Sequence, residues 1–158
     1  MSDFHLLLEE QLPKLMRYAT ALTRDDDEAG ELIEDTVREA LARQREWCGN
    51  ADIRVWLLTL LHDLRGNPFR QLTLSRPAAR DPAAELTLSA LDHALGRLPE
   101  EQRALILLIG LEDLSYANTA DILRISVPTL RSRLARARAD LHRLMGVEEA
   151  PHLSHVAA

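Results

Sequence analysis

Apolar residues recur at three- and four-residue steps along most of the chain, and this spacing is typical of helices. From Phe4 to Leu22 the spacing is helical, but Pro13 interrupts it, so we expect a short helix or turn and then a better helix. Another helix is expected from Asp27 to about Arg45, with Asp25 or Asp26 as its N-cap. No run of alternating β-branched residues is long enough to suggest a sheet. The pattern therefore predicts an all-α protein.

The same spacing predicts further helices, separated by turn-forming residues. Residues 45–52 have the composition of a loop, and an apolar helix is expected over residues 53–64, ended or kinked by Gly66-Asn67-Pro68. Later in the chain, residues 89–98 are expected to form one helix. Pro99 is expected to open another helix, which runs to about Leu111.

Residues 114–145 have the pattern of a helix-turn-helix. Ser115 can cap the first helix, and Arg124-Ile125-Ser126 makes the turn, with Ser126 placed to cap the second helix. Pro128 falls in the first turn of that second helix, where its missing N–H costs nothing. The buried face of the second helix is expected to comprise Leu130, Leu134, Ala137, Leu141 and Leu144. Its other positions are filled by Arg131, Arg133, Arg136, Arg138 and Arg143. A cationic helix behind a tight turn is the shape that enters a DNA major groove, although a solvated outer face is the plainer alternative.

Charge is distributed unevenly along the chain. Residues 115–146 hold six Arg against two Asp, a net of +4, whereas residues 1–70 hold nine basic and fourteen acidic side chains, a net of −5. The whole chain carries −6, so the positive potential is local and a general affinity for polyanions is not expected. The positively charged segment, residues 115–146, is suited to binding DNA, whereas the negatively charged residues 1–70 are suited to a different kind of partner.

A length of 158 residues allows one medium domain or two small ones. We predict two small helical domains, residues 1–70 and 86–146, joined by a flexible linker at 71–85 and followed by a disordered tail at 147–158. Each core is expected to be marginal unless a partner covers part of it, because small domains bury a small fraction of their surface.

Nothing in the sequence predicts a catalytic residue, a metal site or a cofactor. The histidines are scattered, and no His/Cys cluster has zinc spacing. The acidic run at residues 25–28 is better explained as a helix cap, because consecutive helical residues point in different directions. The longest apolar run, residues 104–111, is far too short to cross a membrane. With a single cysteine, Cys48, and no signal-peptide pattern, the expected location is the cytoplasm.

The order of these segments resembles the extracytoplasmic-function (ECF) group of bacterial RNA polymerase sigma factors, and it is closest to the general-stress-response sigma factors. The matching segments are RYATALTRDDDEAGELIEDTVREALAR at 17–43, IRVWLLTLLHDL at 53–64, LGRLPEEQRALILL at 95–108 and LSYANTADILRISVPTLRSRLARARADL at 114–141. The resemblance implies a sigma region 2-like domain followed by a sigma region 4-like helix-turn-helix domain. It also implies a function without catalysis, in which the protein directs promoter recognition and transcription initiation.

The resemblance implies several partners. These are core RNA polymerase, contacted at the clamp of its largest subunit and the flap of its second subunit, together with promoter DNA and an anti-sigma factor. The acidic helix at residues 28–41 matches the surface that grips the clamp, which implies that Glu31, Glu34, Asp35 and Arg38 bind polymerase. A merely solvated acidic face is the alternative.

The resemblance also implies which residues contact DNA. The loop at 46–52 matches the segment that captures a flipped base of the minus-ten element, which assigns Trp47 and Asn50 to DNA, although Trp47 could equally pack. Arg54 and Arg65 match the part that contacts the non-template strand. The residues expected to face the minus-thirty-five element are Pro128, Thr129, Arg131, Ser132, Arg133 and Arg136.

The chain departs from the family pattern at several positions. Glu34 and Asp63 stand where glutamine and asparagine are usual, residues 66–69 replace a richer basic stretch, and Arg124 replaces a common turn glycine. An aspartate near a DNA phosphate is unfavourable, which predicts weak or altered minus-ten binding. These losses invite a second hypothesis, a sigma mimic that occupies an anti-sigma factor, although the arginines kept on the recognition helix favour a true sigma factor. A helix-turn-helix repressor that never touches polymerase is a third reading, and it leaves the acidic first domain unexplained.

Overall fold

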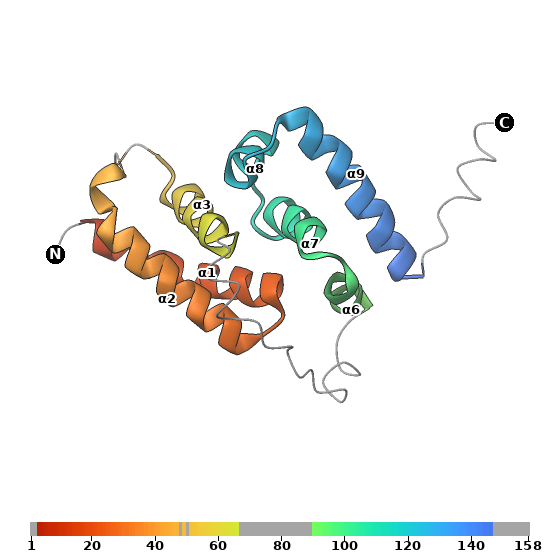
Figure 1. Ribbon diagram of the computed structural model, residues 1–158, viewed down its shortest axis with the longest axis horizontal. Helices are drawn as coiled ribbons and strands as arrows, with labels where there is room; N and C mark the ends of the chain where they lie inside the picture. Colours follow the sequence, from red (N-terminus) through yellow and green to blue (C-terminus); the bar gives the residue numbers. More distant parts are fainter. Residues whose placement is uncertain (1–2, 48, 50, 67–89, 147–158) are drawn as a thin grey trace.

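The computed structural model describes residues 3–47, 49, 51–66 and 90–146, and no strand occurs among them (Figure 1). The predicted linker at 71–85 and the predicted tail at 147–158 lie outside the described residues. The described residues between 3 and 66 are called the first half below, and residues 90–146 are called the second half.

The first half contains three α-helices and a short 3₁₀ turn. They are α1 (Asp3–Thr23), α2 (Asp26–Ala42), η1 (Gln44–Glu46) and α3 (Ile53–Arg65). Asp25 is the N-cap of α2, as its position before the helix predicts, and its carboxylate accepts from the Glu28 N–H at 2.9 Å. Asp52 caps α3 in the same way by accepting from the Arg54 N–H at 2.9 Å. Helix α2 packs against both α1 and α3.

The expected break at Pro13 is wrong, because α1 runs through this proline without interruption. Pro13 lies on the exposed face of α1, where the carbonyl that loses its partner can bind water instead. On the other face, Leu8 and Leu15 are buried on either side of the proline. Packing of this continuous apolar face therefore outweighs the local cost of the proline, which is about 3 kcal/mol in a helix interior.

The second half contains four α-helices and a π-helical turn. They are α6 (Ala90–Arg97), α7 (Glu100–Ile106), η2 (Leu107–Leu111), α8 (Tyr116–Leu123) and α9 (Val127–Leu144). The single helix expected from Pro99 to Leu111 changes to π geometry at its end, where the Glu112 N–H donates to the Leu107 carbonyl at 3.0 Å. Helix α9 packs along α7 and also contacts α6 and α8.

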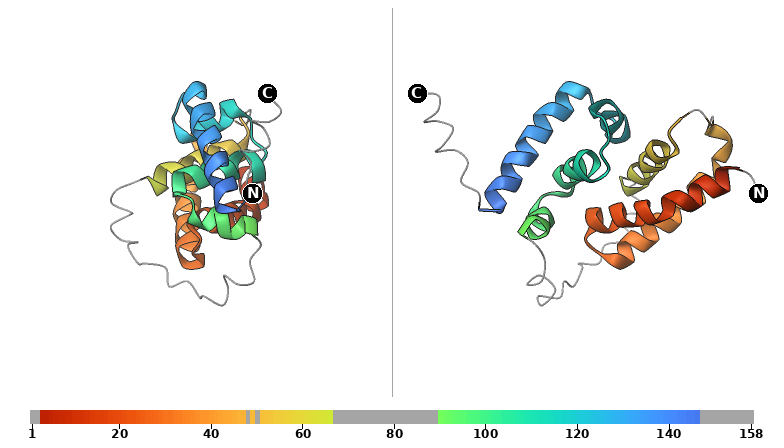
Figure 2. Two further views of the ribbon diagram at one scale, coloured as in Figure 1. Left: turned by 90° about the vertical axis from the view of Figure 1, so that its right-hand side faces the viewer. Right: turned by 180° about the vertical axis from the view of Figure 1, so that it is seen from behind.

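The two halves share one hydrophobic core. Helix α3 packs against α8, and α1 packs against α7 and η2, so that α3 and α8 lie side by side where the halves meet (Figure 1, Figure 2). Tyr18 and Leu61 of the first half belong to the same buried cluster as Leu108 and Ile122 of the second half. Each half thus provides the cover that a core of its size requires.

Candidate nucleic-acid interface

The helix-turn-helix forms with the caps that the sequence predicts. The Ser115 hydroxyl accepts from the Asn118 N–H at 3.0 Å and begins α8, and the Ser126 hydroxyl accepts from the Thr129 N–H at 3.2 Å and begins α9. Between them, Arg124 ends α8 in the left-handed conformation, with φ 56° and ψ 44°. A left-handed residue is the usual way to end a helix and turn the chain sharply.

Helix α9 divides into a buried face and a cationic face. Leu130, Leu134, Ala137 and Leu141 are buried, as predicted, whereas Leu144 in the last turn is only half-buried. The residues expected to face the minus-thirty-five element lie on the other side, where Pro128, Arg131, Ser132, Arg133 and Arg136 are exposed and Thr129 is half-buried. The guanidinium of Arg131 lies over the ring of Tyr116 from α8, 6.0 Å from its centroid. This cation–π contact joins the N-terminal part of the cationic face of α9 to the preceding helix, α8.

The acidic face of α2 lies on an outer surface of the first half. Glu31, Glu34 and Arg38 are exposed and Asp35 is half-buried. Arg38 donates to the Asp35 carboxylate at 2.9 Å. Their spacing places these four residues on one face of α2, and α2 itself lies well separated from α9 (Figure 1).

The residues expected to contact the minus-ten element, Trp47, Asn50, Arg54 and Arg65, lie in different surroundings. Trp47 is half-buried, with its ring 5.7 Å from that of Phe4 and its indole N–H donating to the Ala51 carbonyl at 3.1 Å. Of the two readings left open for Trp47, the packed one describes this state. Asn50 lies outside the described residues.

Arg54 and Arg65 both face the second half instead of open solvent. A nitrogen of Arg54 lies 3.8 Å from the buried Glu112 carboxylate. Arg65 donates to both carboxylate oxygens of Glu100, with distances from 2.5 to 3.1 Å, and also to Glu28. Burial alone would lower the pKa of Arg65, but these two carboxylates raise it overall, so the guanidinium stays charged.

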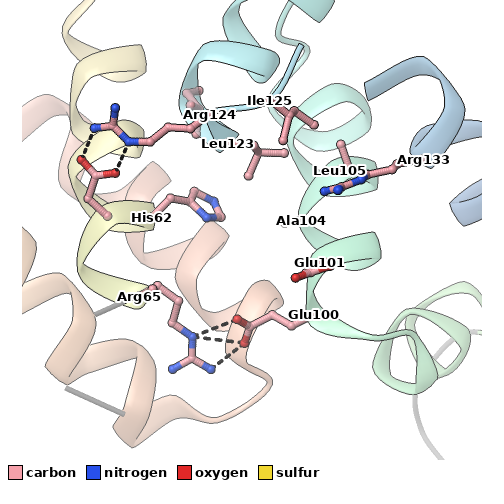
Figure 3. Close-up of a pocket in the computed structure, with 13 residues that line it drawn as sticks. His62, Arg65, Glu100, Glu101, Ala104, Leu105, Leu123, Arg124, Ile125 and Arg133 are labelled. Carbon is pink, nitrogen blue, oxygen red and sulfur yellow. Dashed lines mark hydrogen bonds and ion pairs between the residues drawn. The ribbon is translucent and has the colours of Figure 1, made fainter. Parts of the chain in front are cut away.

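Asp63 and Arg124, two residues that depart from the family pattern, form an ion pair with each other. Arg124 donates to the two carboxylate oxygens of Asp63 at 2.8 and 2.7 Å, so the pair joins α3 to the turn after α8 (Figure 3). This hydrogen bonding lowers the pKa of Asp63. The sequence pointed to both positions as unusual, but nothing in it indicated that residues 61 positions apart would meet.

A cavity of about 490 Å³ opens between the halves beside these pairs. His62 and Arg124 line one side of it, and Glu101 and Arg133 line the other (Figure 3). His62 is half-buried, and its Nε2 atom lies 2.6 Å from the hydroxyl oxygen of Tyr18, with which it shares a hydrogen bond. Burial lowers the pKa of His62 to about 4, so this imidazole is neutral at physiological pH.

The residues that form ion pairs and hydrogen bonds between the two halves could not be identified from the sequence. Asp92, Glu100 and Glu112 each face an arginine of the first half, and Arg103 reaches a carbonyl of α1. Their positions depend on how the halves pack, and no local pattern reports that. Within the described residues, no group of three or more His, Cys, Asp or Glu side chains is placed to hold a metal. No helix of that part of the chain is long and apolar enough to cross a membrane.

An all-α fold with a capped, arginine-faced helix-turn-helix is typical of DNA-binding proteins. Comparison with known proteins makes the class specific. Residues 88–141 match the family described as sigma-70, region 4, and residues 8–62 match the family described as the sigma2 domain of PhyR.

Individual relatives match over nearly the whole chain. The chain is 31% identical to the ECF RNA polymerase sigma factor SigM of Mycobacterium tuberculosis, over 90% of this chain and 77% of SigM. It is 29% identical to the ECF sigma factor EcfG of Rhodopseudomonas palustris, over 88% and 83% of the two chains. The solved structure of the sigma factor RpoE in complex with the anti-sigma factor NepR, from Bartonella quintana, matches with a TM-score of 0.78 and 30% identity, over 94% of this chain and all of RpoE.

The chain belongs to the ECF family of RNA polymerase sigma factors. Sigma factors are transcription initiation factors and not enzymes, which confirms the expectation that this chain has no catalytic activity of its own.

Proposed function

We propose that this protein binds core RNA polymerase in the cytoplasm, directs it to a promoter and is controlled by an anti-sigma factor. The observation that carries the proposal is the division of α9. Its apolar face is buried from Leu130 to Leu141, while Arg131, Arg133 and Arg136 are exposed in the N-terminal part of the same capped helix. A helix held rigidly on one side, with free arginines on the other, is able to read base edges in a major groove.

Contact with polymerase is assigned to the acidic face of α2. Glu31, Glu34 and Arg38 are exposed, and Arg38 and Asp35 form a pair with each other. Such a face is complementary to a basic or mixed surface, as the clamp of the largest subunit would present. The second half would contact the flap of the second subunit.

Promoter reading is tested by transcription with purified core polymerase and two double variants. Arg131→Ala/Arg133→Ala should abolish promoter-directed transcripts and leave polymerase binding intact. Arg97→Ala/Arg143→Ala removes the same charge from exposed positions away from the exposed arginines at the start of α9, so it should transcribe like the wild type. Equal output from the two double variants would remove the DNA-reading role from α9.

Polymerase binding is tested in the same way on the first half. Glu31→Lys/Glu34→Lys reverses the charge of the α2 face and should weaken binding to core polymerase. Glu9→Lys/Glu10→Lys makes the same change at exposed positions of α1 and should not. If both double variants bind polymerase like the wild type, α2 is not the contact surface.

Control by an anti-sigma factor is supported by the match to RpoE. RpoE was solved in complex with the anti-sigma factor NepR, and the match covers both halves of this chain at a TM-score of 0.78. A score this high over 94% of the chain requires the two halves to be arranged much as they are in RpoE. An anti-sigma factor that recognises the two halves in this arrangement could therefore bind the protein in the state described here.

A second candidate function has one specific observation in its favour. Residues 8–62 match the sigma2 domain of PhyR, and PhyR itself has been solved as an anti-anti-sigma factor in complex with NepR. A sigma mimic would bind an anti-sigma factor and direct no transcription. Failure of wild-type protein to support transcription, together with a tight complex with an anti-sigma factor, would favour this candidate.

A further inference from the structure

The exposed arginines at the start of α9 lie in different surroundings. Two positions along a helix amount to about 200° of rotation, so Arg131 and Arg133 leave α9 on opposite flanks of its exposed face. On one flank, the guanidinium of Arg131 lies over the ring of Tyr116, 6.0 Å from its centroid. On the other flank, Arg133 lines the cavity between the halves together with Glu101 (Figure 3). The two arginine side chains are therefore not equivalent, although both are exposed.

Tyr116 is anchored in the core of the helix-turn-helix. It is the first residue of α8 and directly follows the capping Ser115. Its half-buried side chain packs against a hydrophobic cluster that comprises Leu105, Ala120, Leu130 and Leu134. Leu130, the neighbour of Arg131 in α9, is fully buried in this cluster. Because both partners of the cation–π contact are tied to the same core, the contact restricts where the guanidinium of Arg131 can lie.

A ring contact holds an arginine without using its hydrogen-bond donors. The guanidinium carries five N–H donors, and a bidentate carboxylate partner takes two of them, as Asp63 does from Arg124. The face of an aromatic ring attracts the charge instead, so this contact does not consume the N–H donors of Arg131. Bidentate binding to the O6 and N7 atoms of guanine requires two such donors from one side chain. A side chain that is already restricted also loses less conformational entropy on binding.

We propose that Tyr116 is a specificity-determining residue of the promoter-reading surface, because its ring positions Arg131 to bind the guanine of one G·C pair in the minus-thirty-five element. Tyr116 does this without contacting that base itself. The inference rests on the proposed function, in which α9 reads the promoter. Arg133, on the opposite flank of α9, acts independently of Tyr116.

Three substitutions at Tyr116 separate the aromatic ring from the packing. Tyr116→Phe keeps the ring and removes only the hydroxyl. Tyr116→Leu keeps an apolar side chain but removes the aromatic face, and Tyr116→Met is a second variant without a ring, because methionine adapts to irregular gaps. Arg131→Ala removes the reading side chain itself, at an exposed position. Circular dichroism and urea unfolding establish that each variant is folded.

The first readout needs neither DNA nor polymerase. In an NMR spectrum of the full chain, the Nε–Hε signal of Arg131 reports the contact, because a proton near an aromatic face is shifted by the ring current. Tyr116→Leu and Tyr116→Met should move this signal toward that of a solvated arginine, and Tyr116→Phe should leave it in place. The Arg133 signal, as the control, should not move in any variant. An Arg131 signal that stays in place in both variants without a ring would overturn the positioning by Tyr116.

The second readout is transcription from promoters that differ at single base pairs of the minus-thirty-five element found in the transcription assay. Arg131→Ala identifies the base pair at which Arg131 discriminates. Tyr116→Leu should reduce the preference for guanine at that base pair by roughly two- to fivefold, which corresponds to the loss of an exposed cation–π contact. The other base pairs should be unaffected, and Tyr116→Phe should keep the preference. In the double variant Tyr116→Leu/Arg131→Ala, loss of the ring should add nothing to the loss of the arginine.

The pattern of loss separates positioning from a role in stability. Equal loss of transcription at every base pair would mean that Tyr116 only supports the fold, and an unchanged preference in Tyr116→Leu would mean that Arg131 reads without it. Either result would overturn the proposal. Failure of the wild-type protein to transcribe would count against the proposed function and would overturn base reading by Arg131, while the NMR signal decides separately on the contact with Tyr116.

Discussion

The guanidinium of Arg103, from α7, lies where the C-terminal ends of α1 and α6 meet. Arg103 is 7% exposed and donates to the carbonyls of Leu95 and Leu98 at 2.9 and 2.8 Å, with a longer contact to Gly96 at 3.5 Å. It also donates to the carbonyl of Leu22 in the last turn of α1. One side chain thus satisfies the carbonyls that α1 and α6 leave without helical partners, at ends where a positive charge is favourable.

Replacing Arg103 with methionine keeps most of the stem and removes these bonds. The Leu22, Leu95 and Leu98 carbonyls would lose a charged donor in a buried place. Each lost bond contributes about 1–1.5 kcal/mol net, once the cost of burying the guanidinium is included, so the free energy of unfolding should fall by about 3–4.5 kcal/mol.

Urea unfolding followed by circular dichroism measures this change. Arg97→Met is the matched control, because Arg97 is an exposed arginine of α6 and its replacement should change stability by less than about 0.5 kcal/mol. A loss below about 1 kcal/mol for Arg103→Met would contradict this role of the Arg103 guanidinium. It would mean that water, or a rearranged interface, satisfies these carbonyls as well as the guanidinium does.

Two further predictions concern stability. The pKa of His62 is about 4 in the folded protein and about 6.5 when unfolded. The unfolded chain therefore binds the proton more readily, and stability should fall by roughly 1.4 kcal/mol per pH unit as pH drops from 6.5 toward 4. His62→Gln should flatten this dependence and the exposed His93→Gln should not; equal pH profiles would contradict the assignment. Ser126→Ala should destabilise the protein by about 1 kcal/mol in thermal unfolding, through loss of the α9 cap. Ser132→Ala, at an exposed position of the same helix, should not destabilise it, and equal losses would argue against the cap.

Local features of the fold could be predicted from the sequence because they depend on nearby residues. The caps at Asp25, Ser115 and Ser126 and the buried face of α9 follow from residue type and helical spacing. The path of α1 through Pro13 could not be predicted in this way, because packing against α2 and the second half decides it.

The contact between the halves could not be predicted for a related reason. Arg65 was assigned to DNA by its place in the family pattern, and the partners that surround it here, Glu28 and Glu100, lie 37 and 35 positions away. Asp63 and Arg124 stood out as unusual residues, but only the packed structure shows that they form a pair. Charge pattern alone reports that a residue is available for an ion pair and does not report its partner.

The most direct test of the account is run-off transcription with purified core polymerase, this protein and a fragmented genomic template, with a known sigma factor as a positive control. If the protein is a promoter-reading sigma factor, we expect discrete new start sites that share two upstream elements, one near minus ten and one near minus thirty-five. Absence of such starts from folded protein, while the control sigma factor transcribes from the same core, would contradict it.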